Sequence, residues 1–487
     1  MKEKNEMSDF RLIEELKVED CNFDFHGMKI HFFENCSFLL YSALKEEESQ
    51  NVASNYLSFI FDLLISFSFV LLTKIGQIKT CREKKVMFFA YTGNQAKNLL
   101  PVYENLSKTE DSCFIPRQTS IHNKLNTIFF RKKSNIYNEL DLGHLKYDFV
   151  QKYATLSSVK TAFQFIMWAF VSKRKITKHI KYLSQRYNCP GKENYIFNLL
   201  VSSYLHNLFI LSLSRNYMLK KNIKLIVLSN EFTMPGNLLI MLAKSLNIKT
   251  LYIPHSIITG HPAYEQIHSD KVVLQGQHDY DLLKYEYNVP ADKLVVTGRP
   301  FIEQRLIKYS KGKKNIDTKI ICLATQPLSV KIKFVKDIID ELRKVNNSNI
   351  KIVIKPHPSE KPTDYEHLET INVEVSKEND LFEVLSTSDL VMTINSNAAA
   401  EAAFLGLPAL SYNPWQLHKP IYVKKGIIEE IVNKEDILIK VEEMLFNRAA
   451  INNYEKRAEE YTYYMNHKID GKSNERIVSV IKSLISE

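Results

Sequence analysis

The stretch SDLVMTINSNAAAEAAFLGLPAL, residues 388–410, consists of a short apolar run, a small polar turn and an alanine-rich segment. The apolar run predicts a buried strand, and the alanines predict a helix that begins near Ser396. The next residues, PALSY (408–412), predict a second strand. Because a strand, a helix and a strand in this order are typical of a parallel sheet, the stretch predicts an α/β fold.

The alternation of strands and helices extends from this stretch toward both ends of the chain. Strand-like runs lie on either side of a polar linker, YSKGKKNIDT (309–318), at residues 86–91, 223–229, 249–255, 271–276, 293–300, 319–325, 350–358 and 372–375. Apolar residues at helical spacing separate several of these runs. Two such series joined by a linker predict two facing Rossmann-like parallel-sheet domains.

The expected segments follow from these two series. We predict an irregular and helical extension, a first Rossmann-like domain with a basic helical insertion at 118–222, a second such domain, and C-terminal helices, at residues 1–80, 81–305, 306–450 and 451–487. In parallel sheets of this kind, ligands bind beyond the carboxyl ends of the strands. Residues that directly follow strands are therefore the candidates for a functional site.

The composition of the 487-residue chain limits the classes of protein to consider. Apolar residues make up 45% and charged residues 25%, which excludes disorder as the overall state. The 13 glycines form no GxGxxG and no GxxxxGK[ST] pattern, which counts against a dinucleotide fingerprint and a Walker phosphate loop. The 65 Lys and Arg against 55 Asp and Glu give a formal net charge of +10, a modest excess that is compatible with an anionic partner.

The cysteines and the first residues predict a cytoplasmic protein. The six cysteines are scattered and form no CxxC pair, as is typical of reduced thiols. The first residues contain no apolar core of a signal peptide. The apolar stretch Leu57–Leu72 contains Asp62 and is shorter than a membrane span, so we expect a buried or interfacial helix, with a membrane-seated helix as the alternative.

Two motifs follow strands in the C-terminal half and suit a ligand that contains phosphate. In KPHPSE, Pro356 and Pro358 stiffen the backbone on either side of His357, so that its imidazole is aimed and can donate to a phosphate. At Ser396, a hydroxyl and the free N–H groups of a helix start suit phosphate as well. A structural interpretation stays open, in which Ser396 caps the helix and Glu401 is a solvated helix residue.

Residues from about 224 to 408 resemble the C-terminal two-thirds of glycosyltransferases of the B fold (GT-B). Within that superfamily the chain is most similar to bacterial surface-polysaccharide transferases with an HP motif and a Ser motif, such as polysialyltransferases and CDP-glycerol glycerophosphotransferases. Here the HP motif is His357-Pro358, and the Ser motif centres on Ser396. The resemblance implies a metal-independent enzyme without a cofactor. It would bind a nucleotide sugar in the C-terminal domain, and a glycan or lipid-linked glycan acceptor in the N-terminal domain.

The resemblance also implies a donor type and several residue roles. The donor is expected to be CMP- or CDP-linked, with a uridine nucleotide as the alternative. His357 and Ser396 would contact the donor phosphate, and Glu401 would accept hydrogen bonds from the ribose. Further residues that follow strands complete the expected site, with Thr325, Gln326, Pro358 and Asn397 on the donor side and Gly93 and Asn94 on the acceptor side.

Sugar transfer needs a base for the acceptor hydroxyl and positive groups for the leaving nucleotide. Glu231 or His255 is the expected base, and Arg299 is expected to stabilise the leaving phosphate together with His357. Structural interpretations remain open for each, with Glu231 as a carboxylate at a helix start, His255 as a core histidine and Arg299 as a brace of the linker.

The chain departs from the families that it resembles in two places. Sialyl- and polysialyltransferases carry an acidic pair before a glycine, and the N-terminal half contains no such triplet. Glu231 in SNEFTMPGN is the nearest candidate. Glycerophosphotransferases have His-Gly where this chain has His255-Ser256, which counts against transfer of a polyol phosphate.

Three alternative functions stay open beside sugar transfer. The segment 269–300 also resembles UDP-GlcNAc 2-epimerases, so a related isomerase is the first alternative. A polyol-phosphate transferase that uses CDP-glycerol is the second, and a non-catalytic scaffold that kept the fold is the third. The long basic and aromatic region before residue 222 favours a transferase, because an epimerase needs no acceptor site.

The remaining patterns bear on partners. The acidic pair in Asp279–Asp281 resembles the DxD of metal-dependent transferases but begins a helix, and the histidines near it are widely spaced, so no metal is expected. The basic clusters near Arg131 and Lys173 accompany no recognition module, so we expect no nucleic acid. These clusters predict either a solvated face or attraction to an anionic membrane surface. The expected location is the cytoplasm, with peripheral attachment to the inner face of the plasma membrane as an option.

Overall fold

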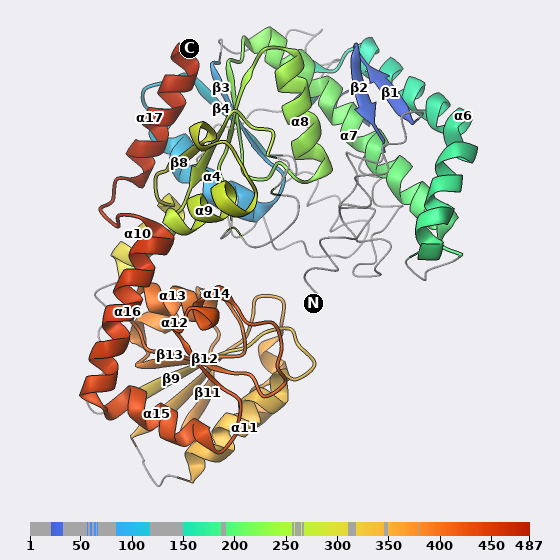
Figure 1. The fold of residues 1–487 in the computed structure, drawn as a ribbon. Coiled ribbons are helices and arrows are strands. Elements are labelled where there is room, and N and C mark those ends of the chain that lie inside the picture. The colour runs from blue at the N-terminus through green and yellow to red at the C-terminus, as the bar shows by residue number, and fades with distance from the viewer. Residues whose placement is uncertain are drawn as a thin grey trace. The chain divides into compact units, whose positions relative to one another are not determined.

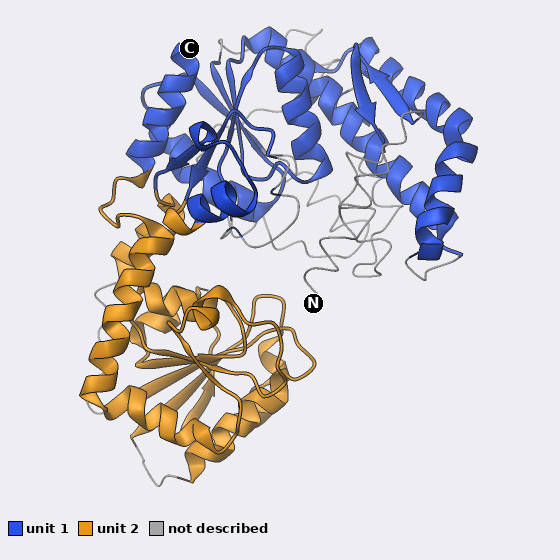
Figure 2. Ribbon diagram, viewed as in Figure 1, with its two compact units in different colours: residues 1–274, 279–297, 474–487 blue, residues 275–278, 298–473 orange. Residues whose placement is uncertain are grey.

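The computed structural model divides into two compact units, which Figure 1 shows by element and Figure 2 by unit. Unit 1 comprises residues 1–274, 279–297 and 474–487, and unit 2 comprises residues 275–278 and 298–473. The structure describes residues 21–32, 56, 59–60, 63–64, 66, 84–116, 150–186, 191–255, 258, 264, 267–309, 318–344, 349–378 and 380–487.

Unit 1 is built on a six-stranded parallel sheet in the order β4-β3-β5-β6-β7-β8. Most residues of these strands are buried Val, Ile, Leu and Phe, as expected for a parallel sheet that is covered on both faces. The order reverses between β3 and β5, because the chain extends the sheet from β3 to β4 on one side and from β5 onward on the other. The strands are β3 (Val86–Ala90), β4 (Ser112–Pro116), β5 (Leu225–Leu228), β6 (Lys249–Tyr252), β7 (Lys271–Leu274) and β8 (Leu294–Val296).

Helices cover both faces of this sheet. On one face, α4 and α17 pack in one buried cluster with alternate residues of β3, and Ile477, Ile481 and Leu484 are the buried residues of α17 in it. On the other face, α7 and α8 pack with Met87 and Phe89 of β3. The helical elements of this part of the chain are α4 (Gly93–Leu106), η2 (Val150–Tyr153), α6 (Leu156–Arg186), α7 (Glu193–Lys221), α8 (Met234–Ser245), α9 (Gln277–Asp281), η4 (Leu282–Glu286), η5 (Ala291–Lys293) and α17 (Ser473–Ser486).

A β-hairpin of β1 (Asn22–Phe25) and β2 (Met28–His31) packs beside α6 and α7. The expectation of an irregular and helical extension is wrong for these residues. His26 (φ 51°) and Gly27 (φ 84°) form a two-residue turn with positive φ, which suits the twist of a tight hairpin. The hairpin has aromatic partners in the helices, since the rings of Phe23 and Phe165 lie 5.3 Å apart and the Tyr204 hydroxyl donates to the Phe32 carbonyl at 2.7 Å.

α7 is long and apolar enough to cross a membrane by length and composition alone. However, 89% of its most apolar 18-residue stretch is buried inside the protein, where the helix lies between α6 and α8. α7 is therefore a core helix of unit 1. The stretch Leu57–Leu72 lies mostly outside the described residues, and its predicted helix stays a prediction.

Unit 2 contains a second six-stranded parallel sheet, in the order β11-β10-β9-β12-β13-β14. The order reverses between β9 and β12. The strands are β9 (Lys319–Ala324), β10 (Ile350–Lys355), β11 (Val373–Val375), β12 (Leu390–Thr393), β13 (Ala409–Tyr412) and β14 (Glu429–Ile431). The helices are α10 (Pro300–Tyr309), α11 (Lys331–Arg343), η6 (Pro362–Asp364), η7 (Glu366–Leu368), α12 (Leu381–Thr387), α13 (Ala398–Phe404), α14 (Ile421–Lys424), α15 (Asp436–Phe446) and α16 (Arg448–Asn466).

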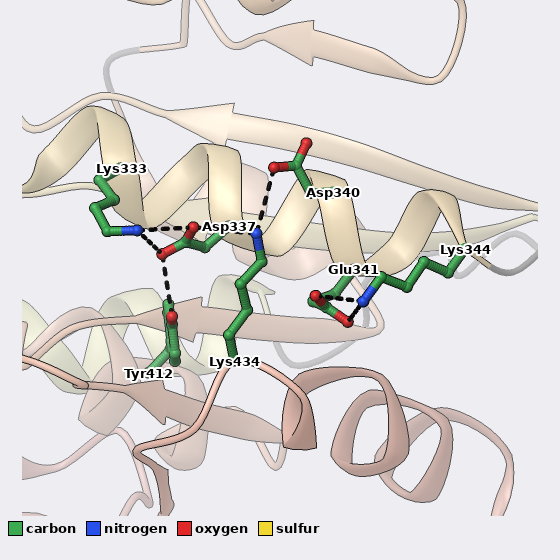
Figure 3. Close-up of polar contacts among 7 residues, drawn as sticks. All are labelled: Lys333, Asp337, Asp340, Glu341, Lys344, Tyr412 and Lys434. Atoms are coloured by element: carbon green, nitrogen blue, oxygen red, sulfur yellow. Dashed lines mark hydrogen bonds and ion pairs between the residues drawn. The ribbon is translucent and has the colours of Figure 1, made fainter.

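An ionic cluster centred on Asp337 fastens α11 to its neighbours. Figure 3 shows Lys333, Lys434 and Tyr412 converging on this carboxylate, at 2.9, 3.2 and 3.1 Å. Burial alone would raise the pKa of Asp337, but these three donors lower it below its ordinary value. The cluster therefore holds α11 against β13 and the loop before α15, and the start of α11 can contribute to a site at the sheet edge.

The predicted fold class is confirmed, because the chain contains two Rossmann-like parallel sheets with helices between the strands.

The units differ in extent from the predicted segments. Residues 298–473 form a continuous part of unit 2, and the last helix, α17, returns to the core of unit 1. The turn before α17 is fixed by the buried carboxylate of Glu303, which accepts hydrogen bonds from the main-chain N–H groups of Asp470, Gly471 and Ser473 at 3.1, 3.0 and 3.1 Å.

Candidate functional site

A reciprocal pair of hydrogen bonds joins the loops that follow β9 and β12. The Gln326 side chain donates from Nε2 to Asn395 Oδ1 at 2.8 Å, and the main-chain N–H of Asn395 donates to Gln326 Oε1 at 3.0 Å. These loops lie where the strand order of unit 2 reverses. A reversal of this kind is where open α/β sheets bind their ligands, so Gln326 and Asn395 lie at the point where the topology predicts one.

The carboxylate of Glu360 gathers four donors in the loop after β10. Its Oε2 accepts hydrogen bonds from the Thr325 hydroxyl at 2.6 Å and the main-chain N–H of His357 at 3.0 Å, while Oε1 accepts one from the Tyr365 hydroxyl at 2.9 Å. Lys331 Nζ at the start of α11 lies 3.3 Å from Oε1. Burial alone would raise the pKa of Glu360, but these donors lower it below its ordinary value. An ionised Glu360 therefore fixes the turn that carries His357.

His357 is exposed and has an assignable tautomer. Its Nδ1 accepts a hydrogen bond from the main-chain N–H of Ser359 at 3.2 Å and lies 2.8 Å from Ser359 Oγ. Because a main-chain N–H can only donate, the hydrogen of the neutral ring is assigned to Nε2. The ring is still partly covered, and this partial burial lowers the pKa of His357, while Glu360 partly offsets the effect and Lys355 adds to it. The neutral ring therefore has an Nε2–H donor of the kind that suits a phosphate oxygen.

The Ser motif forms the entry to α13. Ser396 Oγ accepts a hydrogen bond from the main-chain N–H of Ala398 at 3.2 Å, and the Ser396 carbonyl accepts one from the Tyr422 hydroxyl at 2.5 Å. Ser396 thus has the capping contact that the structural interpretation requires, while its own O–H can still donate. Asn397 is exposed at the start of the helix, and Pro358 is exposed in the neighbouring HP loop.

The charges of Arg299 and Arg305 act on the carboxyl group of Glu401 in unit 2. Burial raises the pKa of Glu401 to about 7, and the positive charges of Arg299 and Arg305 counteract that rise. Gly298 precedes Arg299 with a φ of +83°, a conformation that favours glycine and directs the chain into α10. The structure therefore associates Arg299 with Glu401, which the sequence placed about one hundred residues apart.

In unit 1, a buried polar network holds His255 at the end of β6. His255 Nδ1 lies 2.9 Å from the Ser229 carbonyl, and Asn98 Nδ2 donates to Ser229 Oγ at 3.0 Å and to the carbonyls of Ile253 and Pro254 at 3.2 and 3.1 Å. Because a carbonyl can only accept, the hydrogen of the neutral His255 ring is assigned to Nδ1. Its Nε2 is then the basic nitrogen, which is the arrangement that a general base requires.

Glu231 follows β5 but turns into the protein. The side chain accepts hydrogen bonds from the main-chain N–H groups of His268 and Ser269 at 2.8 and 3.2 Å, and from the Ser269 hydroxyl. The residue is 1% exposed, and burial raises the pKa of its carboxyl. These contacts are those of a carboxylate that anchors the 268–269 loop, and they favour His255 over Glu231 as the base.

Gly93 and Asn94 begin α4 directly after β3. Gly93 is buried and Asn94 is exposed. The helix start is fixed by Thr92, whose hydroxyl accepts from the Gln95 main-chain N–H at 3.4 Å, and by Gln95 Oε1, which accepts from the Tyr91 main-chain N–H at 2.8 Å. Asn94 therefore lies where the strand order of unit 1 reverses, beside the ends of β3 and β5.

The sequence did not point to several residues that organise these two edges. Asn98 and Ser229 in unit 1 belong to no recognisable motif, and their hydrogen bonds join residues that are far apart in the sequence. Glu360 is the last residue of the motif KPHPSE. The acid lies three residues after a histidine that is flanked by prolines, and this spacing could have pointed to its role. Within the part of the chain that the structure describes, no group of three His, Cys, Asp or Glu side chains is arranged to hold a metal ion.

Comparison with solved structures shows which fold the chain shares. It is similar to UDP-GlcNAc 2-epimerase from Neisseria meningitidis bound to UDP-GlcNAc, with a TM-score of 0.52 and 15% identity, covering 82% of this chain and 100% of that chain. It is also similar to a glycosyltransferase from Rickettsia africae (TM-score 0.48, 11% identity, 84% and 100% covered) and to the wall teichoic acid polymerase TagF (TM-score 0.45, 10% identity, 88% and 98% covered). The first likeness places the chain in the class of folds with two Rossmann-like domains.

Within this class, residues 302–402 match the model of glycosyltransferase family 52. The matched segment contains the HP loop, the Ser motif and the Gln326–Asn395 pair. No protein of curated function matches the sequence. The match and the fold together support a glycosyltransferase, in agreement with the GT-B resemblance of the sequence.

Proposed function

We propose that the protein transfers a sugar from a nucleotide-activated donor to a growing bacterial surface glycan of the capsule, lipopolysaccharide or teichoic type. One observation carries the proposal. The loops after β9, β10 and β12 are tied together at the reversal point of the unit 2 sheet, within the segment that matches glycosyltransferase family 52. The donor would bind there, with His357 Nε2 and the Ser396 hydroxyl directed to its phosphate.

The proposed reaction assigns one task to each unit. In unit 1, His255 Nε2 takes the proton of an acceptor hydroxyl, and the oxygen forms a bond to the anomeric carbon of the donor sugar. The bond from that carbon to the donor phosphate breaks, and its electron pair stays on the phosphate oxygen. In unit 2, the His357 Nε2–H donates to this oxygen and Arg299 contributes positive charge, which stabilises the leaving nucleotide.

The donor is proposed to carry a cytidine nucleotide, CMP or CDP, because the HP and Ser motifs occur together. Glu401, whose carboxyl oxygens accept hydrogen bonds when ionised, would bind the ribose hydroxyls. The acceptor is proposed to be a glycan or lipid-linked glycan at the inner face of the plasma membrane. Neither a metal nor another cofactor has a task in this scheme, since the histidine and the arginine supply the positive partners.

Thermal stabilisation by nucleotides tests the proposal directly. The purified full-length protein is heated with CMP-, CDP-, UDP- and GDP-linked ligands, and the shift of Tm is compared. A ligand at 100 times its Kd stabilises the folded state by about 2.7 kcal/mol, which is readily measured. We expect the cytidine ligands to give the largest shift and His357→Ala to remove it. His367→Ala, which changes an exposed histidine in η7, is the matched control and should leave it unchanged.

The alternatives predict other results. A preference for UDP ligands would overturn the cytidine assignment, and conversion of UDP-GlcNAc without an acceptor would indicate an epimerase. Transfer of glycerol phosphate from CDP-glycerol would indicate a polyol-phosphate transferase. The absence of a Tm shift with every nucleotide would contradict an enzyme of this class and favour a scaffold.

A further inference from the structure

The first half of α6 has large apolar side chains on its outward face. Leu156, Phe163, Phe170 and Val171 are 87%, 62%, 75% and 78% exposed. Together with three further exposed residues they form what we call the α6 ridge, which consists of Leu156, Val159, Phe163, Ile166, Met167, Phe170 and Val171. At 3.6 residues per turn the ridge occupies about 140° of arc and extends for about 24 Å along the helix.

The opposite face of the same helix already supplies the packing that the fold requires. Phe165, Ala169, Ile176 and Ile180 of α6 are fully buried or nearly so, in the cluster that contains α7 and the β1–β2 hairpin. A helix at the surface of a soluble protein typically has one apolar face and one polar face. α6 has apolar residues on both faces over its first half, so the α6 ridge is not explained by the core of unit 1.

The second half of α6 continues the outward face with positive charge. By the same helical geometry, Arg174, Lys178 and Lys181 fall on the arc of the ridge, and so does Lys160 in the first half of the helix. The helix contains seven basic residues and no Asp or Glu, the basic residues being Lys160, Lys173, Arg174, Lys175, Lys178, Lys181 and Arg186. One face of α6 is therefore apolar at its beginning and cationic at its end.

We propose that the α6 ridge inserts into the headgroup region of a membrane that is rich in anionic phospholipid. Apolar side chains would enter the boundary between headgroups and acyl chains while the lysines and arginines contact lipid phosphates, which is how a helix binds in the plane of a membrane. The inference rests on the proposed function and deepens it. It names the part of the protein that would bind the membrane where the proposed acceptor lies.

Charge decides between a membrane and a second copy of this chain. Two copies that paired through this face would bring one basic helix against another, and α6 offers no acidic residue to compensate. An anionic lipid surface complements the whole face, because lysine and arginine stems lie along apolar surface while their heads reach phosphates. A large exposed apolar patch of this kind marks an interaction surface rather than ordinary solvent contact.

Vesicle flotation with the full-length protein tests the inference. The vesicles consist either of phosphatidylcholine alone or of phosphatidylcholine with 30% phosphatidylglycerol, a value chosen to give a clear excess of negative charge (roughly one lipid in three). We expect binding to the anionic vesicles only. The double substitution Phe163→Gln with Phe170→Gln should lower the coefficient for partition of the protein from water to these vesicles by at least about tenfold. Arg174→Glu with Lys178→Glu should weaken it by a similar factor and reduce its dependence on salt.

Matched controls separate docking from folding. Ile371→Gln with Ile439→Gln changes two exposed apolar residues of unit 2, which are 97% and 64% exposed, and should leave binding unchanged. The Tm shift with nucleotide should persist in every α6 variant, so a failure of docking is distinguishable from a failure of the proposed function. Equal binding of wild type and ridge variant would overturn the inference. A wild-type dimer that the ridge substitutions convert to a monomer would overturn it in favour of self-association.

Discussion

Glu360 Oε2 accepts a hydrogen bond from the main-chain N–H of His357 at 3.0 Å. The same carboxylate binds the Thr325 hydroxyl and Lys331, so one buried charge joins the end of β9, the HP loop and the start of α11. His357 is the residue proposed to donate a hydrogen bond to the phosphate of the nucleotide sugar. Its orientation therefore depends on Glu360, an acid that does not itself need to contact the nucleotide sugar. Glu360 is a positioning residue in this arrangement.

Replacing Glu360 should destabilise unit 2 and weaken nucleotide binding together. Glu360→Ala leaves the Thr325 hydroxyl, the Tyr365 hydroxyl and Lys331 without their acceptor, which should cost about 3 kcal/mol of unfolding free energy. Denaturant unfolding measures this loss, and calorimetry with the preferred nucleotide measures the affinity. Glu366→Gln, at an exposed position of η7, is the control and should change neither quantity. An unchanged affinity in Glu360→Ala would contradict the positioning role.

His255 and Glu231 should respond differently to substitution. His255→Ala removes the proposed base, so kcat should fall by roughly a hundredfold or more, while the nucleotide-induced Tm shift persists. Glu231→Gln replaces an anchor of the 268–269 loop, so it should lower the unfolding free energy by about 2 kcal/mol and act on transfer only through stability. Loss of transfer in Glu231→Gln with an unchanged Tm would reverse the two assignments.

Glu401 should make stability depend on pH near neutrality. Its pKa of about 7 in the folded protein exceeds the ordinary value of 4.5, so the folded state holds the proton more tightly than the unfolded state. The stabilising contribution is fully present below about pH 4.5 and is lost as the pH rises through about 7. Relative to Glu401→Gln, wild type should lose at most about 1.4 kcal/mol per pH unit in this range. If the unfolding free energy of the two proteins changes with pH by the same amount from pH 5 to pH 8, the assignment is refuted.

Transfer should continue when divalent metals are removed. The proposed scheme stabilises the leaving phosphate with His357 and Arg299, so none of its steps depends on a metal. Transfer from the preferred nucleotide sugar, measured with and without excess EDTA, should change by less than about twofold. A loss of activity that Mg²⁺ or Mn²⁺ restores would require a metal in the donor site.

The sequence predicted those features that local patterns determine. Apolar runs and helical spacing located most strands of both sheets, and KPHPSE directed attention to the loop that carries His357. The role of Glu360 needed contacts between two separate segments, the connection from β9 to α11 and the loop after β10. The burial of Glu231 depended on residues 37 positions further along the chain. The β1–β2 hairpin was missed because its strands have four residues each, which is too short for periodicity to register.

α6 illustrates a different limit of sequence analysis. Its apolar residues recur at helical spacing on two faces, and only the packed structure distinguishes the face that contains Phe165 from the face that contains Phe163. Burial fractions, and not periodicity, identified the α6 ridge. The effect of the Arg299 and Arg305 charges on the pKa of Glu401 likewise could not be seen in the linear chain.

The return of α17 to unit 1 constrains the order of events when the protein is made. Ile477, Ile481 and Leu484 complete the core cluster that contains Val86, Phe88 and Leu225. These residues are synthesised after the whole of unit 2, whereas domains generally fold in the order of their synthesis. Unit 1 thus remains open along part of one face of its sheet until unit 2 has been synthesised, although most of its residues emerge first. A nascent chain that stalls before residue 473 would expose that apolar face to chaperones and proteases.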